Sequence, residues 1–433
     1  MASIPQSTLF SWEDLQPLGD LERLQWVLET IPDESLMRIL EHDRGRGRND
    51  YPIRAMWNSV LAGIVFQHPT IESLRRELNR NGQLREMVGL GSVAPSAWAY
   101  TRFLHRILEH LEDLDTMIHH VIDDLQQVLP DFGERLAIDS KAIESFAKRR
   151  SDDTTPDGRR DTDADWGKKT YRGVDAKGKV WEKVTAWFGY KIHLLVDATY
   201  ELPVAWTVTK ASTADITEAP KLLAQLQSKH PLALQAARVL TGDRGYDDTK
   251  LVRSLWDDYG IKPVIDIRNM RKDGDPTRML PGHDTVTYNY RGDVFCHHPE
   301  TGAVHRMANG GFEADRDTLK KRCPAKFAGI TCEAQDTCPV AQGIRISLET
   351  DRRVFTPMDR SSYAWEREYA HRTAVERVNS RLDVSFGFEL HTIRGMTKMR
   401  ARCGWALLVM LSMALGRIRQ NHPELLRSLV RSA

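Results

Sequence analysis

Residues 135–146 of this chain read RLAIDSKAIESF, and this stretch decides the fold predicted for the middle of the molecule. Its apolar run, residues 136–138, is short and predicts a buried strand. Asp139 follows the run at once, and a carboxylate at or near the centre of a buried strand is costly unless it binds a cation or has a partner. Lys141 points to the same face of such a strand. The stretch therefore indicates either a cation site or a buried pair of Asp139 with Lys141.

A second acid follows a second short apolar strand. In ARVLTGDRGYDD, residues 237–248, the strand is the pair at 239–240, and Asp243 comes where it ends. Gly242 and Gly245 stand on either side of this acid. Glycines there suit a tight turn from strand to helix with close approach of the backbone.

The segments around these two strands complete an α/β pattern. Residues 188–196 and 204–208 have the composition of a hairpin, residues 216–230 and 249–260 that of helices, and residues 262–267 that of a further strand. The chain order is strand with acid, two strands, helix, strand with acid, helix, strand. This order predicts an α/β fold whose core is a ribonuclease H-like mixed sheet flanked by helices.

A third acid lies in YAHRTAVERVNSR, residues 369–381. If the stretch is one helix, Tyr369, Arg372 and Glu376 fall on the same face. One interpretation is a ladder of ion pairs on a solvated surface. The other is a metal-binding carboxylate beside an arginine that grips phosphate.

With these three stretches placed, the sequence resembles the DDE transposases of bacterial insertion sequences. It is similar to the branch whose third-acid helix carries a Tyr–Arg–Glu–Lys signature, because Tyr369, Arg372 and Glu376 match that signature at its usual spacing. The resemblance extends to AIDSKAIES and TGDRGYD around the first two acids. It also covers VFTPMDRSSYAWEREY before the third acid, and the helical front of the chain.

The resemblance implies a site and a reaction. Asp139, Asp243 and Glu376 would be the catalytic acids and would hold two Mg²⁺ or Mn²⁺ ions about 3.5–4 Å apart, on either side of a phosphoryl transfer. The reaction would be cleavage of double-stranded DNA at the element ends and strand transfer into a target, by a homodimer in a synaptic complex. Two alternatives stay open: a ribonuclease H-fold nuclease that only hydrolyses, and an inactive transposase-derived DNA-binding protein.

The signature lysine is missing, since Asp383 occupies its place. Arg381 or Lys398 is the substitute for its contact with DNA phosphate. The residues expected to contact DNA are Tyr369, Arg372, Arg381, Lys398, Lys141 and Arg244. The acids that compete for the catalytic roles are Asp197, Asp215 and Asp266, and Asp197 is the best rival because it also ends an apolar strand.

The first 130 residues predict an all-helical domain. From residue 18 to about residue 129 apolar residues recur every three or four positions. Thr70 and Ser96 have the positions of helix N-caps. The arginines expected on its surface are Arg44, Arg46, Arg48, Arg75, Arg76, Arg80 and Arg102. They indicate either a module that grips DNA phosphates or the charged solvent faces of a helical bundle.

A long insertion precedes the third acid and holds four of the five cysteines. It is expected to be rich in loops and to have little core of its own. The four cysteines are Cys296, Cys323, Cys332 and Cys338. Four thiolates can hold a structural Zn²⁺ ion; free buried thiols are the alternative. A second polar stretch, residues 148–179, predicts a loop or a disordered insertion.

Size and composition place limits on the protein. The chain has 433 residues and a net charge of +1, so no overall basic excess indicates nucleic acid. No signal peptide is evident, and the apolar run at 405–415 is too short to span a bilayer and predicts a buried helix. The cysteine usage predicts a reducing cytoplasm, and the resemblance implies that of a bacterium, with the protein at its nucleoid. The predicted divisions are 1–130, 131–268, 269–360 and 361–433.

Overall fold

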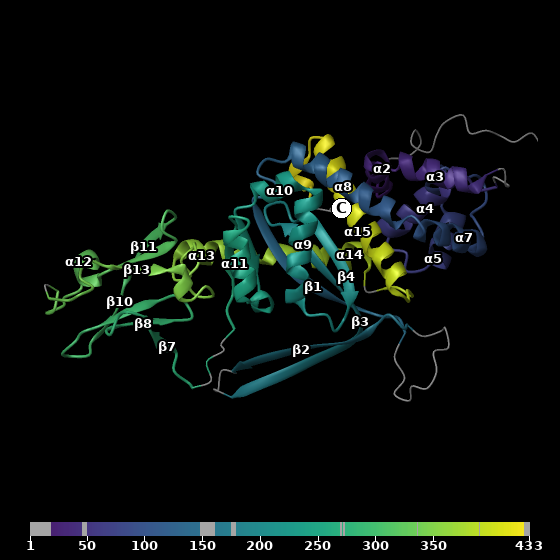
Figure 1. The fold of residues 1–433 in the computed structure, drawn as a ribbon. Coiled ribbons are helices and arrows are strands. Elements are labelled where there is room, and N and C mark those ends of the chain that lie inside the picture. The colour runs from purple at the N-terminus through teal and green to yellow at the C-terminus, as the bar shows by residue number, and fades with distance from the viewer. Residues whose placement is uncertain are drawn as a thin grey trace, which may run out of the picture.

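The computed structural model of the protein describes residues 19–45, 50–147, 161–174, 179–268, 271, 273–335, 337–388 and 390–427. A helical part made by the N-terminal residues lies at one end of the molecule, a central sheet lies in the middle, and the insertion lies at the other end (Figure 1). The last helices of the chain return to the centre, beside the sheet.

The N-terminal part is helical throughout its described residues, as predicted. Its helices are α2 (Leu21–Thr30), α3 (Glu34–Arg44), α4 (Ile53–Val65), α5 (Ile71–Arg80), α6 (Gly82–Met87), α7 (Ala97–Leu108) and α8 (Leu111–Val128). Both predicted N-caps are confirmed: the Thr70 hydroxyl accepts from the Ser73 amide, and that of Ser96 accepts from the Ala99 amide at 3.2 Å.

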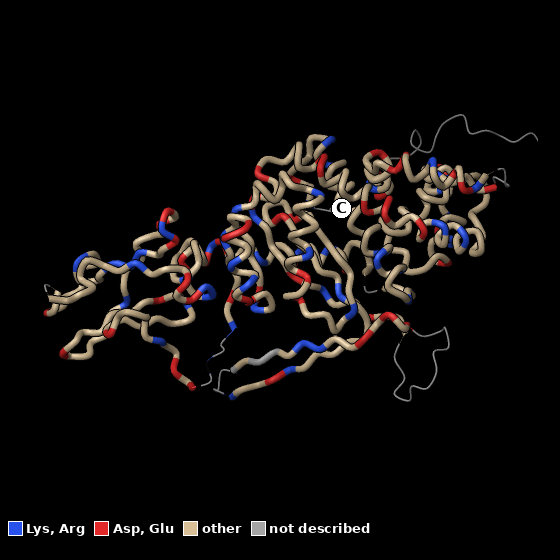
Figure 2. The backbone as a smooth tube through the Cα atoms, viewed as in Figure 1, with Lys and Arg blue, Asp and Glu red and all other residues tan. Residues whose placement is uncertain are grey.

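Several of the predicted surface arginines form ion pairs within their own helix. Arg44 pairs with Glu41, Arg75 with Glu72 and Arg80 with Glu77, each three residues apart. Arg76 and Arg102 are exposed, whereas Arg46 and Arg48 lie outside the described residues. Figure 2 shows basic and acidic residues interspersed along these helices.

The central sheet is mixed, and strand β1 (Arg135–Glu144) lies in its middle. In the body of the sheet the order is β4 (Leu202–Lys210), β3 (Val180–Asp197), β1, β5 (Val239–Gly242), β6 (Lys262–Ile265). β1 pairs antiparallel with β3 and parallel with β5, and β6 is parallel to β5. The predicted hairpin is confirmed as β3 and β4, and all the predicted core strands are present.

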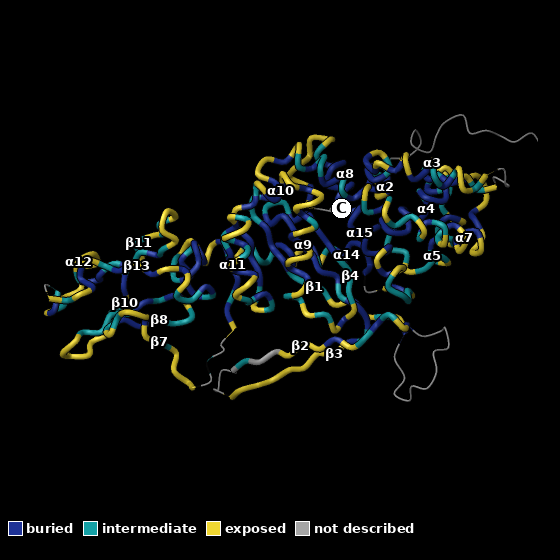
Figure 3. Tube along the Cα trace, viewed as in Figure 1, coloured by how far each residue is buried: buried dark blue, intermediate teal, exposed yellow. Residues whose placement is uncertain are grey.

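The outer half of β3 leaves the body of the sheet as a two-stranded ribbon. It pairs with β2 (Asp165–Val174) in a register that runs from Asp165 opposite Gly189 to Val174 opposite Val180. The ribbon extends below the core, and most of its described residues are exposed (Figures 1 and 3). The prediction of a loop over residues 148–179 is therefore wrong for β2; residues 148–160 lie outside the described residues.

Helices pack around the sheet. α9 (Asp215–Lys229) contacts β1, β3 and β4, α10 (Pro231–Ala236) contacts α9, and α11 (Thr249–Asp257) contacts β6. α13 (Tyr363–Ala370) contacts β5 and β6, and α14 (Thr373–Phe386) contacts β1 and β3. The predicted helices that follow the hairpin and the second acid are thus confirmed.

The C-terminal helix α15 (Met396–Arg419) joins the core to the N-terminal part. It contacts β4 and also α2, α4 and α8, and Cys403 is fully buried in it. By length and composition α15 alone among the described helices is long and apolar enough to cross a membrane, because the helix extends beyond the apolar run at 405–415 on which the expectation of too short a span rested. Its apolar window is 94% buried inside the protein, as expected for the core helix that its sequence predicted.

The insertion is a small β-rich unit, in contrast to the loop-rich segment that we predicted. One sheet has the order β10 (Val304–Arg306), β9 (Val294–His297), β8 (Val286–Asn289), β7 (Thr277–Met279). The other has the order β11 (Ala308–Glu313), β12 (Thr318–Arg322), β13 (Ile344–Ser347), and the short helix α12 (Pro324–Ala328) follows β12. It also has a core of its own, which includes Val286, Val294, Leu319, Ile346 and Phe355.

Candidate active site

Two of the three predicted acids stand at the same level of the sheet. The parallel register pairs Ile138 of β1 with Gly242, the last residue of β5, and Asp139 and Asp243 each follow directly. The backbone amide of Ser140 donates to Asp139 Oδ1 at 2.7 Å, and that of Gly245 donates to Asp243 Oδ1 at 2.6 Å. The sheet register therefore brings together two acids that are 104 positions apart in the sequence.

The turn after β5 depends on a glycine. Asp243 caps the short 3₁₀ helix η1 (Arg244–Tyr246). A Cβ atom on Gly245 would lie 2.7 Å from Asp243 Oδ1, closer than carbon and oxygen tolerate. The sequence had predicted this close backbone approach, and the structure confirms it.

The two acids affect each other electrostatically. The pKa of Asp139 is raised to about 6, first by burial and then by the negative charge of Asp243. Tyr246 is buried beside them, and burial followed by the charge of Asp139 raises the pKa of its hydroxyl well above its ordinary value. A cation placed among these oxygens would remove the repulsion.

A fourth acid, Asp215, belongs to the same surroundings. It is the first residue of α9, and its Oδ2 lies 3.7 Å from the position of a Cβ on Gly245. Its charge contributes to the raised pKa of Asp139. Lys191 donates to Asp215 Oδ1 at 2.8 Å, so this acid already has a cationic partner. The sequence had offered Asp215 only as a competitor of lower rank.

The rival that the sequence favoured lies elsewhere. Asp197 is the last residue of β3 and stands opposite Leu136, three positions before Asp139 on β1. Its carboxylate accepts the amides of Gly133 at 2.8 Å and Tyr200 at 2.6 Å. Asp197 therefore stabilises the turn after β3. Asp266, the third competitor, pairs with Arg244 at 2.5 Å.

The stretch around the third acid is two helices, whereas we predicted one. α13 ends at Ala370 and α14 begins at Thr373. The amides of His371 and Arg372 bond the carbonyls three residues back, which makes a tight turn without glycine or proline.

The predicted side chains nevertheless meet across this turn. Arg372 Nη1 donates to Glu376 Oε1 at 2.6 Å, and the guanidinium lies 5.7 Å from the centre of the Tyr369 ring. Tyr369 in turn stacks on Trp365, with 4.8 Å between ring centres. Burial lowers the pKa of Arg372, but the bond to Glu376 and the charges of Glu376, Tyr369 and Asp139 together raise it above its ordinary value. Arg372 thus links the third acid to the first electrostatically.

The other residues expected to contact DNA have different surroundings. Lys141 Nζ donates to Asp383 Oδ2 at 2.6 Å, so its partner is Asp383 on α14 and the alternative of a pair with Asp139 is not what the structure shows. Arg381 is largely buried, and its Nη2 donates to Glu201 Oε2 at 3.0 Å. Lys398 is exposed in the first turn of α15.

The donor chemistry of the site suits a hard divalent cation. Asp139 and Asp243 offer carboxylate oxygens near enough for the charge of Asp243 to raise the pKa of Asp139, and carboxylate oxygens are ligands that suit Mg²⁺. Glu376 is held by Arg372 and is half exposed. Among the described residues, no group of three or more His, Cys, Asp or Glu side chains is arranged to hold a metal ion as those side chains stand.

A comparison with protein families identifies the family of this chain. The family described as "Transposase DDE domain" matches residues 131–412, which is well over half of the chain and includes all three acids. The chain belongs to the DDE transposase domain family. The resemblance that the acids suggested is thereby confirmed at the level of the family, and the mixed α/β fold agrees with it.

Other comparisons add little to this transposase. No curated protein matches it. Among solved structures it is similar to one described as the cryo-EM structure of a piggyBac transposase synaptic complex with hairpin DNA. The identity is 10%, the TM-score is 0.36, and the match covers 95% of this chain and 79% of the other.

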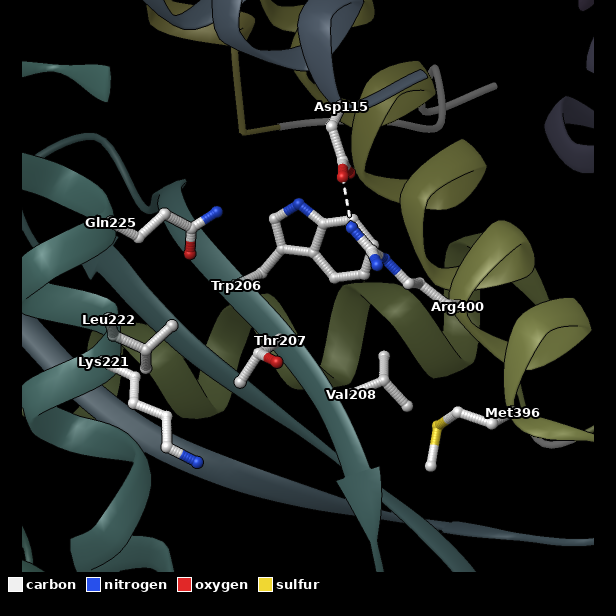
Figure 4. A pocket seen from close by; sticks show the side chains of 9 residues that line it. All are labelled: Asp115, Trp206, Thr207, Val208, Lys221, Leu222, Gln225, Met396 and Arg400. Atoms are coloured by element: carbon white, nitrogen blue, oxygen red, sulfur yellow. Dashed lines mark hydrogen bonds and ion pairs between the residues drawn. The ribbon is translucent and has the colours of Figure 1, made fainter. Parts of the chain in front are cut away.

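Two cavities lie near the core of the transposase, and they differ in their relation to the acids. One, of about 320 Å³, lies between β4, α9 and α15, where an ion pair of Arg400 with Asp115 crosses it (Figure 4). None of the three acids lines it. The other, of about 480 Å³, lies where the core meets the insertion, and its lining includes Arg244, Asp266 and Trp365. This second cavity is the one next to Tyr369, since Tyr369 stacks on Trp365.

Proposed function

We propose that this transposase cuts DNA at the ends of its own element and joins the freed ends to a target, with Asp139, Asp243 and Glu376 as its catalytic acids. The observation that carries the proposal is the parallel pairing of β1 with β5, which places Asp139 beside Asp243. The strand order, with β1 in the middle, agrees with a ribonuclease H-like sheet. The organism we propose is a bacterium, with the protein acting at its nucleoid.

Asp139 and Asp243 would hold the divalent cations, Mg²⁺ or Mn²⁺, and Glu376 would complete their carboxylate ligands. Bound cations of this kind supply Lewis acidity and an activated water or hydroxyl nucleophile. The chain itself supplies oxygen donors that are fixed in place, because backbone amides hold one oxygen of each aspartate. Glu376 becomes available as a ligand when Arg372 releases it.

Arg372 is proposed to grip the DNA backbone beside the reacting bond. Its guanidinium is positioned by Glu376 and by the ring of Tyr369, which is itself fixed on Trp365. A guanidinium binds a phosphate with two parallel hydrogen bonds, which gives orientation as well as affinity. Tyr369 lies beside it and would support the same phosphate.

Lys141 is the best substitute for the missing signature lysine. Its ammonium group reaches Asp383, the residue at the signature lysine's position, from β1 two residues beyond Asp139. A positive charge is thus present beside Asp383, although it comes from Lys141 on β1 and not from α14. Arg381, one of the two substitutes expected from the sequence, is held in an ion pair with Glu201. Lys398 and Arg244 are exposed and remain candidates for the DNA backbone.

Conservative substitutions of the acids test the proposal. Asp139→Asn, Asp243→Asn and Glu376→Gln should each abolish Mg²⁺-dependent cleavage of end DNA, while the shift of that DNA in a gel is retained. Asp197→Asn is the matched control, because Asp197 is a buried acid on the same sheet whose carboxylate accepts the backbone amides of a turn. Normal cleavage by any of the three variants would refute the assignment.

Two further assays separate the rival functions. Strand transfer from precut ends distinguishes a transposase from a nuclease that only hydrolyses. End binding without Mg²⁺-dependent cleavage by the wild type would indicate an inactive, transposase-derived DNA-binding protein, the alternative that Asp383 raises. A homodimer in the synaptic complex is expected to appear as two protein copies per pair of ends in sizing experiments.

A further inference from the structure

The four cysteines of the insertion come together although they are far apart in the sequence. Cys296 lies on β9, Cys323 is the N-cap residue of α12, and Cys332 and Cys338 lie in the segment between α12 and β13. All four line one small cavity of about 20 Å³. A space of this size holds about one water molecule, and therefore also a single ion.

A buried histidine nitrogen points to a ligand in the same cavity. His298 also lines it, and the amides of Glu300 and Thr301 donate to His298 Nδ1 at 3.2 and 3.1 Å. Because Nδ1 accepts these bonds, the proton of the neutral ring is on Nε2. His298 Nε2 is buried, and among the described residues no group accepts a hydrogen bond from it. A buried N–H donor in a pocket lined by four sulfurs would be satisfied by a negatively charged acceptor, such as a thiolate.

We propose that Cys296, Cys323, Cys332 and Cys338 form a structural zinc site and that the Nε2–H group of His298 donates a hydrogen bond to one of the zinc-bound thiolates. Four thiolates in tetrahedral arrangement are a common structural zinc site. Second-shell donors of this kind fix the ligands and tune the metal.

The histidines near the cavity do not compete well as ligands. Coordination through Nε2 of His298 would require its proton to move to Nδ1, which would cost both backbone hydrogen bonds. His297 Nε2 is 2.9 Å from the hydroxyl of Thr287 and is already engaged. The thiol of Cys296 now donates to the His305 carbonyl at 3.6 Å, a weak bond that deprotonation would release.

As the side chains stand, no three of them among the described residues form a metal-binding group, so the sulfurs must move to close on an ion. A cysteine repositions its sulfur by rotation about one side-chain bond between staggered rotamers. Rotation of side chains cannot bring distant residues together, but the backbone already places all four cysteines around one cavity. Zinc binding would thus tighten a preformed pocket.

The position of the site indicates what zinc would stabilise. Cys296 belongs to the sheet of β7–β10, and Cys323 directly follows β12 of the other sheet, so the ion would tie the two sheets together. Two residues before Cys323, the buried Lys321 pairs with Asp359 at 2.5 Å and donates to Ser361 Oγ at 3.0 Å. These residues lead into α13. Zinc would therefore stabilise the segment that positions Tyr369.

The test is the metal content and the spectrum of the full-length protein. Purified from zinc-supplemented medium under reducing conditions, the wild type should contain one zinc per chain. Replacement by Co²⁺ should give the sulfur-to-cobalt charge-transfer absorption and visible bands of a tetrahedral thiolate site. The same content in Asp139→Asn would show that the zinc is not bound at the catalytic acids.

Variants assign the ligands. Cys332→Ala should lose the zinc and the cobalt spectrum, and Cys403→Ala is the matched control, because Cys403 is buried in α15 and should leave both unchanged. His298→Ala should keep the four-thiolate spectrum but bind zinc about 10–100-fold more weakly. A wild type without zinc or a cobalt spectrum, or with four thiols that react freely with a thiol reagent before chelation, would overturn the proposal. A changed cobalt donor set in His298→Ala would overturn the role of His298.

Discussion

Asp139→Asn should stabilise the metal-free protein even as it abolishes cleavage. The aspartate is charged at neutral pH in a place that resists charge, because burial and then the charge of Asp243 raise its pKa from 3.8 to about 6. Asparagine keeps an oxygen that accepts the Ser140 amide and adds an N–H group that can face Asp243. The substitution thus removes a repulsion without leaving a backbone donor unpaired.

The size of the effect follows from linkage. One pKa unit corresponds to about 1.4 kcal/mol, so the shift of Asp139 corresponds to about 3 kcal/mol. The folded protein binds this proton more tightly than the unfolded chain does. The contribution of Asp139 to the free energy of unfolding of the wild type therefore falls as pH rises from about 4 through about 6, and it is level above that. Asp139→Asn does not lose this stability. Its free energy of unfolding should therefore exceed that of the wild type by near zero at pH 4 and by about 1–3 kcal/mol at pH 7.

Thermal and urea unfolding in EDTA, at a series of pH values, measure this difference. Asp197, whose pKa burial also raises to about 6, is present in both proteins and cancels from the comparison. Asp243→Asn is a graded control, since it removes the repulsion on Asp139 but leaves its burial, the larger cause, in place. An Asp139→Asn protein that is no more stable at pH 7, or whose advantage does not depend on pH, would refute the reasoning.

Three other substitutions test the surroundings of the acids. Lys141→Ala should lower DNA affinity and reduce the dependence of log affinity on log salt by about 1, measured by binding titrations at several salt concentrations. Glu201→Ala should destabilise the fold by about 3–5 kcal/mol in thermal unfolding, because it leaves the buried Arg381 without its carboxylate. Arg372→Ala should lower the cleavage rate about 10²–10³-fold while divalent metal binding becomes tighter, since Glu376 is then free; weaker metal binding would contradict this.

The main elements of the fold were predictable because their signals are local. Short apolar runs predicted β1 and β5, and the N-cap residues Thr70 and Ser96 predicted the starts of α5 and α7. The prediction failed for β2, which forms an exposed ribbon and has a polar sequence. Because neither face of the described part of β2 is buried, apolar and polar residues do not alternate along it, and the usual sequence signal of a strand is missing. It failed for the insertion for a similar reason: its strands are three to six residues long, too short for a clear pattern.

The partners within the site could not be predicted, since they depend on contacts between distant segments. Lys141 and Asp383 are 242 residues apart, and Arg381 and Glu201 are 180 residues apart. Along the sequence the acid nearest to Lys141 on the same face of the strand is Asp139, so spacing alone predicted a pair of these two residues. The structure gives it another partner because α14 packs on β1. The break between α13 and α14 has no glycine or proline to mark it.

The arrangement of charges explains why an arginine belongs beside the third acid. Without a cation, burial and then the negative charges of Asp243 and Asp215 raise the pKa of Asp139, so the carboxylates around β1 and β5 repel one another. Arg372 offsets part of this repulsion, because it donates a hydrogen bond to Glu376 and interacts electrostatically with Asp139. A divalent ion bound by the same acids would repel the guanidinium, and Arg372 would then exchange Glu376 for a DNA phosphate. Under the proposed function, metal binding and the grip on DNA would thereby be coupled through one side chain, and a strong grip beside the reacting bond would require a loaded site.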